Sequence, residues 1–158
     1  MLRFMMLVLS LVGSPLIAAA QASHEPRAPS NTSRAQAERT LDAYFAGMHS
    51  HDFSRVPFTH DVVFRGSLHT EPIRGDSAVR AFLVAVAEGA RAVRVEWRVI
   101  DGSRACVHYE YDSKGGAVVP AVTCFRFEGG RIAEERAFFD PRPFLTPPQA
   151  AKDTSRPS

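Results

Sequence analysis

Four segments rich in β-branched and aromatic residues follow one another in the second half of this 158-residue chain, with only short turns between them. They are residues 92–100, 105–111, 118–127 and 131–139. Glycine stands in each connecting turn, and Asp140-Pro141 ends the last segment because proline lacks the backbone N–H that a sheet ladder requires. Connections this short exclude crossover helices, so the pattern predicts four consecutive antiparallel strands.

The preceding half of the chain carries helical patterns. Residues 34–50 place apolar side chains at intervals of three and four, the spacing of an amphipathic helix. A short helix or turn is expected over residues 52–58, a short strand over 62–65, and a further helix over 77–88. Helices followed by strands indicate an α+β domain. We expect three N-terminal helices packed in the concave side of a curved antiparallel sheet.

The N-terminus has the pattern of a signal peptide. Arg3 gives a positive start, the apolar run to Ile17 is too short to span a membrane, and Ala20 and Ala22 precede an expected cleavage before Ser23. We therefore predict an exported protein, either periplasmic or secreted. The expected organisation is a signal peptide (1–22), a disordered leader (23–33), a folded domain (34–145) and a flexible tail (146–158).

Charge and motif content argue against several partners. Removing Arg3 with the signal peptide takes the formal net charge from +2 to +1, a balance that does not favour nucleic acid or an anionic membrane. His49, His51 and Asp52 lie where the first helix ends and the chain turns, without a further clustered ligand, so no metal site is expected. The chain has no glycine-rich phosphate-binding loop, and we predict no cofactor.

Several short motifs resemble a large superfamily of cone-shaped α+β domains. They are Tyr44-Phe45-Ala46-Gly47-Met48 followed by Asp52, Asp61-Val62-Val63-Phe64, Ile73-Arg74-Gly75, Cys124-Phe125-Arg126-Phe127, and Gly130 through Asp140-Pro141. The superfamily includes nuclear transport factor 2, SnoaL-like polyketide cyclases, ketosteroid isomerases and limonene epoxide hydrolases. The resemblance covers roughly residues 35–145 and implies a cavity between the helices and the sheet. Because its members have unrelated activities, it implies a fold more than a reaction.

Strand alternation within this fold predicts the residues that face the cavity. A mostly apolar pocket with few polar groups is typical of small-molecule sites. The alternative interpretation is that these side chains only fill the core. The expected ligand contacts are Met48, Phe64, Phe82, Val107, Tyr109, Thr123, Phe125 and Phe139.

The resemblance does not transfer the acids of two known mechanisms. Ketosteroid isomerases use two acids and a helical tyrosine; Tyr44 matches the tyrosine, but Gly66 and Thr123 stand where the acids belong. Limonene epoxide hydrolases use an aspartate on the last strand, where this chain has Ala137. Neither mechanism is therefore expected, and whether the protein is an enzyme stays open.

Glu135 with Tyr44 is the remaining candidate for catalysis. Glu135 shares the inward face of its strand with Ala137 and Phe139, and burial among such neighbours raises a carboxyl pKa toward neutrality. Arg94, Arg98 and Arg126 are expected on the outward face, although pairing of Glu135 with a basic residue at the rim is the alternative. We predict that a small hydrophobic, carbonyl-bearing molecule is bound and undergoes proton transfer of the isomerase, dehydratase or cyclase type. The alternative is a non-catalytic module that carries a ligand or dimerises.

The outward faces of the strands support two further expectations. If Asp112 and Val118 flank their turn, Cys106 lies opposite Cys124, and a disulfide is predicted between them. The outward apolar residues predict a homodimer interface. These residues are His108, Val122, Cys124, Ile132 and Phe138.

Overall fold

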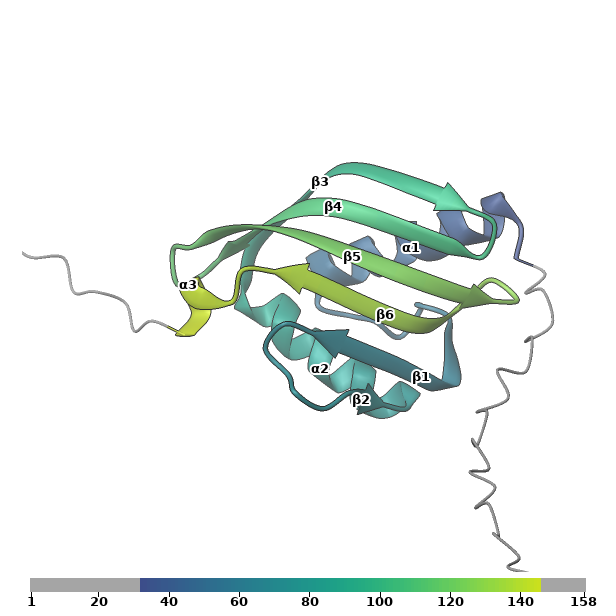
Figure 1. Ribbon diagram of the computed structural model, residues 1–158, viewed down its shortest axis with the longest axis horizontal. Coiled ribbons are helices and arrows are strands. Elements are labelled where there is room, and N and C mark those ends of the chain that lie inside the picture. The colour runs from purple at the N-terminus through teal and green to yellow at the C-terminus, as the bar shows by residue number, and fades with distance from the viewer. Residues whose placement is uncertain (1–31, 146–158) are drawn as a thin grey trace, which may run out of the picture.

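The computed structural model describes residues 32–145, in which a curved sheet wraps around helices (Figure 1). The order of elements is α1 (Arg34–Ser50), β1 (Phe58–Gly66), β2 (Ile73–Arg74), α2 (Asp76–Gly89), β3 (Ala90–Asp101), β4 (Arg104–Ser113), β5 (Val118–Glu128), β6 (Arg131–Phe139) and α3 (Arg142–Leu145). The expected signal peptide, the tail and most of the leader lie outside the described residues. Among the described helices, none combines the length and apolar character needed to cross a membrane.

The first helix is fixed at its N-terminus by a capping box. The Ser33 hydroxyl accepts a hydrogen bond from the Gln36 N–H (3.2 Å), and Gln36 Oε1 accepts one from the Ser33 N–H (2.8 Å). The chain then leaves α1 through His51, whose left-handed φ of 60° is tolerated at a helix end. The buried stripe of α1 includes Leu41 and Tyr44, so the helix presents its apolar face to the sheet.

The sheet confirms the α+β class and adds one parallel pairing. Its strand order is β2-β1-β6-β5-β4-β3, and β3 to β6 form the expected antiparallel meander. Strand β1 pairs with β6 in parallel, with Phe64 opposite Glu135, so the six-stranded sheet is mixed rather than wholly antiparallel. Parallel strands need a long connection, and here β2, α2 and strands β3 to β5 lie between β1 and β6 in the chain. This length allows β1 to pair with β6 in parallel.

Contrary to the expectation of three N-terminal helices, the third helix lies after the last strand. Only α1 and α2 precede the meander, and the third helix, α3, follows β6. Residues 52–57 form turns, in which Asp52 Oδ1 accepts a hydrogen bond from the Ser54 N–H at 2.8 Å. Aspartate bonded in this way to the backbone two residues later favours a turn over a helix.

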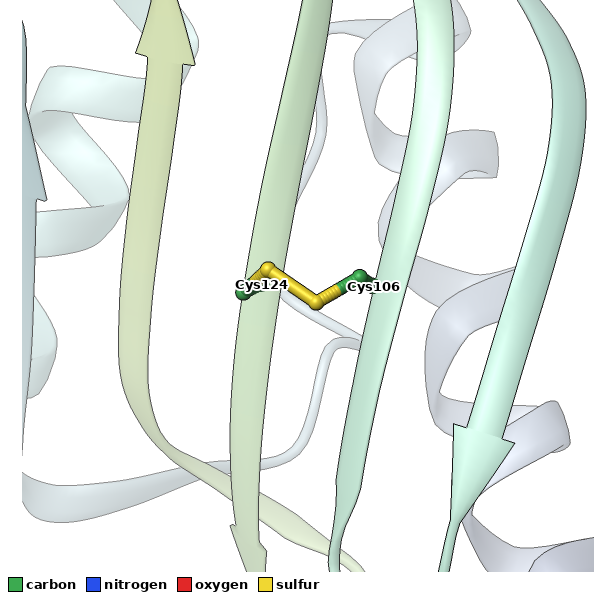
Figure 2. The surroundings of a disulfide bond; sticks show 2 residues. All are labelled: Cys106 and Cys124. Carbon is green, nitrogen blue, oxygen red and sulfur yellow. A yellow bond between two sulfur atoms is a disulfide. The ribbon is translucent and has the colours of Figure 1, made fainter.

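The predicted disulfide is confirmed. Cys106 lies opposite Cys124 in the β4–β5 register, and their sulfur atoms are 2.07 Å apart (Figure 2). The neighbouring pair, Val107 and Thr123, is buried on the other side of the sheet, so the disulfide lies on the convex face. A bond of this kind persists in an oxidising compartment.

Two β-bulges, one in the β3–β4 pairing and one in the β5–β6 pairing, turn side chains to the face opposite the one that strand alternation predicts. A register shift between Val95 and Trp97 sets Arg98 opposite Val107, on the concave side, where it binds Asp42 of α1 at 2.7 Å. A second shift, between Arg126 and Phe127, leaves Ile132 fully buried in the core. The outward placements expected for Arg98 and Ile132 are therefore wrong, because a β-bulge adds a residue to one strand and changes its alternation.

Candidate functional site

A cavity of about 170 Å³ lies between α1, α2 and the concave side of the sheet. Five of the expected ligand contacts line it: Met48, Phe64, Phe82, Tyr109 and Phe139, together with Tyr44 and Glu135. The other three expected contacts, Val107, Thr123 and Phe125, are buried in the core and do not line it. The remaining wall is largely apolar and consists of Gly66, Leu68, His69, Leu83, Val86, Tyr111, Val119, Ala121, Ala137 and Phe144.

Small residues on the strands leave the space for this cavity. Ala121 on β5 and Ala137 on β6 both face inward, and Gly66 on β1 lies opposite Ala137 in the register. A Cβ atom on Gly66 would come within 2.9 Å of the Phe64 ring, so a larger residue there would displace that ring. Gly66, Ala121 and Ala137 thus leave space in the cavity and bring no carboxyl group to it.

Glu135 is the carboxyl group of the cavity and is almost fully buried, with 1% of its surface exposed. The Tyr44 hydroxyl donates a hydrogen bond to Glu135 Oε1 at 2.5 Å. The second oxygen, Oε2, is buried and has no hydrogen-bond partner among the described residues. An unpaired buried oxygen is costly, so Glu135 has an unused hydrogen-bonding group in a residue that lines the cavity.

Tyr44 is held in place by aromatic neighbours. Its ring makes edge contacts with Phe45 (5.3 Å between ring centres), Phe53 (5.7 Å) and Phe125 (5.1 Å). Such edge-to-face packing fixes the ring more firmly than aliphatic contacts alone. Because α1 positions Tyr44 and β6 positions Glu135, the hydrogen bond between them joins the helical wall of the cavity to the sheet.

Burial dominates the protonation of this pair. It raises the pKa of Glu135 to about 8, against a smaller lowering from the Tyr44 hydrogen bond. Burial, reinforced by the charge of Glu135, raises the pKa of Tyr44 well above its usual value. Tyr44 is consequently a neutral donor at physiological pH, whereas Glu135 is mostly protonated at pH 7 and ionises just above it.

The other tyrosine hydroxyls of the cavity already have partners. Tyr109 Oη lies 3.1 Å from Thr123 Oγ1, and burial raises the pKa of Tyr109 to about 12. The Tyr111 hydroxyl donates to the Val86 carbonyl of α2 at 2.7 Å. Thr123 therefore contributes to the site by engaging Tyr109 rather than by touching the cavity, and Glu135 Oε2 remains the buried polar atom without a partner in this wall.

Sequence reasoning missed the residues that surround one end of the cavity. Leu68 and His69 belong to the segment between β1 and β2, where strand alternation gives no prediction. The His69 ring meets Phe82 edge-on at 5.0 Å, which places a titratable side chain in this wall. Phe144 comes from α3 and packs against Tyr111 (5.9 Å) and Phe139 (5.7 Å). The Asp140-Pro141 turn was the available signal that the chain folds back here.

Within residues 32–145, no three histidine, cysteine, aspartate or glutamate side chains are grouped so as to hold a metal ion. The His49, His51 and Asp52 side chains accordingly form no such group. The polar side chains in the cavity wall are the carboxyl group of Glu135, the hydroxyls of Tyr44, Tyr109 and Tyr111, and the imidazole of His69.

Residues 41–135 match the family model of the SnoaL-like domain. The chain belongs to this family. No curated protein matches the chain at a significant level. Solved structures with the NTF2-like fold resemble it over most of their length, and one of them is a steroid delta-isomerase from Pseudomonas aeruginosa (TM-score 0.62, 22% identity, 70% of this chain and 84% of that one).

Two further relatives show the same fold. A protein from Jannaschia sp. CCS1, proposed to be a SnoaL-like polyketide cyclase, has a TM-score of 0.59 and 22% identity, covering 73% of this chain and 93% of that one. An NTF2-like protein of unknown function from Cytophaga hutchinsonii has a TM-score of 0.57 and 17% identity, covering 70% and 95%. At these identities the likeness establishes the fold, and the reaction has to be argued from the residues of this SnoaL-like chain.

Replacing Glu135 by glutamine should flatten the dependence of stability on pH. The unfolded chain releases this proton near pH 4.5 and the folded chain near pH 8, so the folded state binds more protons between them and loses stability as pH rises. Glu135→Gln removes that loss and should be roughly 5 kcal/mol more stable than the native protein at pH 9, with little difference at pH 4. Urea unfolding across this range measures the effect.

Glu134→Gln is the matched control for this measurement. Glu134 precedes Glu135 but faces the other side of the sheet, where it pairs with Arg136 at 2.7 Å. It should keep the native decline of stability between pH 5 and pH 8. A decline that persists in Glu135→Gln would show that Glu135 is not the group responsible.

Proposed function

We propose that this SnoaL-like protein binds a small hydrophobic molecule with a carbonyl group and that Glu135 transfers a proton to or from it. The observation that carries the proposal is the buried, unpartnered Oε2 of Glu135 in an otherwise apolar cavity. The cavity of about 170 Å³ is smaller than sites for drug-sized ligands, which are roughly 300–1,000 Å³. A compact apolar ligand with one polar group suits both the volume and the wall.

The two protonation states of Glu135 would serve complementary steps. In the neutral state, Oε2–H donates a hydrogen bond to the carbonyl oxygen of the ligand. In the ionised state, the carboxylate accepts a proton from the carbon next to the carbonyl and returns it to the same or a conjugated carbon, so no proton is gained or lost overall. A pKa of about 8 makes both states accessible near neutral pH.

Tyr44 is a positioning residue in this proposal. Its hydroxyl binds Oε1 and leaves Oε2 without a partner, and the same hydrogen bond stabilises the carboxylate when it forms. Tyr44→Phe would remove this stabilisation and raise the pKa of Glu135 further. A mutation of this kind should shift the pH at which the base becomes active without altering the shape of the cavity.

A non-catalytic ligand carrier is the second candidate. It is favoured by the presence of a single carboxyl group in the cavity wall, since Gly66 and Ala137 supply none. The proposed place of action is an oxidising, exported environment, which the Cys106–Cys124 disulfide supports. The signal peptide expected at residues 1–22 stays a prediction.

Exchange of α-protons for deuterium separates the enzyme from the carrier. We expect the native protein, incubated in D₂O with small ketones such as cyclohexenone, indanone and acetophenone, to catalyse α-deuteration of at least one of them, as seen by proton NMR. Glu135→Gln should lower the exchange rate at least about 100-fold, the range for removing a general base, while the ketone still raises the melting temperature. Tyr44→Phe should move the pH–rate profile to higher pH.

Each result of this experiment decides between the candidates. Binding without exchange would favour the carrier and contradict proton transfer. A full exchange rate in Glu135→Gln would remove Glu135 from the reaction. If none of the ketones either binds or exchanges, the proposed ligand class is wrong.

We further propose that two copies of the chain associate through the convex face of the sheet. The register aligns Trp97, His108, Val122 and Phe138 in one row across four strands, and the indole of Trp97 stacks on the His108 ring at 5.4 Å. Trp97 and Phe138 remain about half exposed at the two ends of this row, and contiguous exposed apolar surface favours an association site. The Arg94–Glu110 ion pair flanks the row. Because its two charges cancel, it does not repel the same surface of a second copy.

Light scattering on Phe138→Lys tests this association. We expect the native protein to have the mass of a dimer at tens of micromolar and Phe138→Lys to have that of a monomer, because the charge would be buried at the contact. Leu145→Lys, at an exposed position on α3, is the control and should remain dimeric. A monomeric native protein would contradict the proposal.

A further inference from the structure

A second hollow, of about 320 Å³, lies at the end of the domain away from α3. Its walls are the first half of α1, the segment before β1 and the turn between β5 and β6, which Figure 1 shows together on the side opposite α3. It shares no lining residue with the cavity of Glu135. Three arginines from these three segments line it: Arg39, Arg55 and Arg131.

These arginines differ from most others in the described chain. Arg34, Arg80 and Arg98, for example, each have a carboxylate within 3 Å. Arg39, Arg55 and Arg131 have no carboxylate oxygen within 4 Å among residues 32–145. The hydrogen bonds of Ser54 lower the pKa of Asp52, and the charge of Arg55 adds only a smaller effect.

Hydrogen bonds join the segments that carry the three arginines. The Thr40 hydroxyl of α1 donates to the Gly130 carbonyl at 2.6 Å, and the Ile132 N–H of β6 donates to the Pro57 carbonyl at 2.8 Å. Arg80 of α2 holds the segment before β1 by donating to the Phe53 and Val56 carbonyls. The backbone positions of the arginines are consequently fixed before any ligand arrives, which lowers the ordering cost of binding.

Three guanidinium groups around one hollow favour binding of an anion that has enough oxygen atoms to accept hydrogen bonds from all three. A planar carboxylate offers two oxygens and is satisfied by one arginine in a bidentate contact. A tetrahedral phosphate or sulfate offers at least three and can meet donors that approach from different segments. Gln36 adds a further donor, because its Oε1 is engaged by the Ser33 N–H while its amide nitrogen remains available.

We propose that this hollow binds the phosphate or sulfate group of an anionic ligand. Arg39, Arg55 and Arg131 would bind its oxygens, and the β5–β6 turn would form the adjoining wall. The site is separate from the cavity of Glu135 and does not depend on the reaction proposed there. The same group occurs on soluble esters and on the headgroups of anionic phospholipids, and the hollow fits the chemistry of both.

Titration with inorganic phosphate and pyrophosphate, followed by ¹H–¹⁵N NMR at constant ionic strength, tests the site. We expect saturable shifts in the backbone amides of Gly129, Gly130 and Arg131. Each of Arg39→Gln, Arg55→Gln and Arg131→Gln should weaken binding about five-fold, as expected for loss of one partly exposed charge-assisted hydrogen bond. Arg74→Gln is the control, since Arg74 also lacks a carboxylate within 4 Å among the described residues but lies on β2 outside the hollow, and it should bind like the native protein.

The same variants distinguish the two sources of the group. Co-sedimentation with phosphatidylglycerol vesicles that depends on the three arginines would indicate a lipid headgroup, whereas phosphate binding without co-sedimentation would indicate a soluble ester. The proposal is overturned if phosphate shifts none of these amides. It is also overturned if acetate shifts them as strongly, or if Arg74→Gln weakens binding as much as the variants in the hollow.

Discussion

The hydrogen bond between Tyr44 and Glu135 is the contact on which the interior of this domain depends. It joins α1 to β6 at 2.5 Å, and both side chains are buried. A carboxyl group at such a position destabilises the fold when it is charged, so the protein keeps it largely neutral at pH 7. Three aromatic rings hold Tyr44, and the alanine and glycine positions of the sheet keep space open beside Glu135.

The two ends of the domain differ in the polarity of the side chains that line their hollows. At one end, the aromatic residues of α2, β6 and α3 surround an apolar cavity with one unpartnered carboxyl oxygen. At the other end, Thr32 and Thr40 bind both the N–H and the carbonyl of Gly130, and arginines from three segments surround a polar hollow. The sheet connects these regions without a shared residue. This SnoaL-like domain therefore has two separate hollows, one with a largely apolar wall and one lined by arginines.

Local sequence patterns were sufficient to predict much of this arrangement. The glycine turns set the β4–β5 register, which in turn paired Cys106 with Cys124, and strand alternation turned Glu135 toward Tyr44. Alternation failed at Arg98 and Ile132, because the bulges that redirect them depend on tertiary packing and have no clear local signal. The parallel β1–β6 pairing and the placement of His69 likewise arise from long-range contacts. The sequence predicted the residues of regular strands better than those of loops.

Direct titration of the Glu135 carboxyl group tests the central claim, that burial in an apolar cavity keeps this group neutral. ¹³C NMR of glutamate-labelled protein, with the resonance assigned by its absence in Glu135→Gln, follows the side-chain carboxyl as pH rises. The account predicts a midpoint near pH 8, well above the ordinary value of 4.5. A midpoint near 4.5 would show that Glu135 is solvated or paired in solution, and would contradict the account.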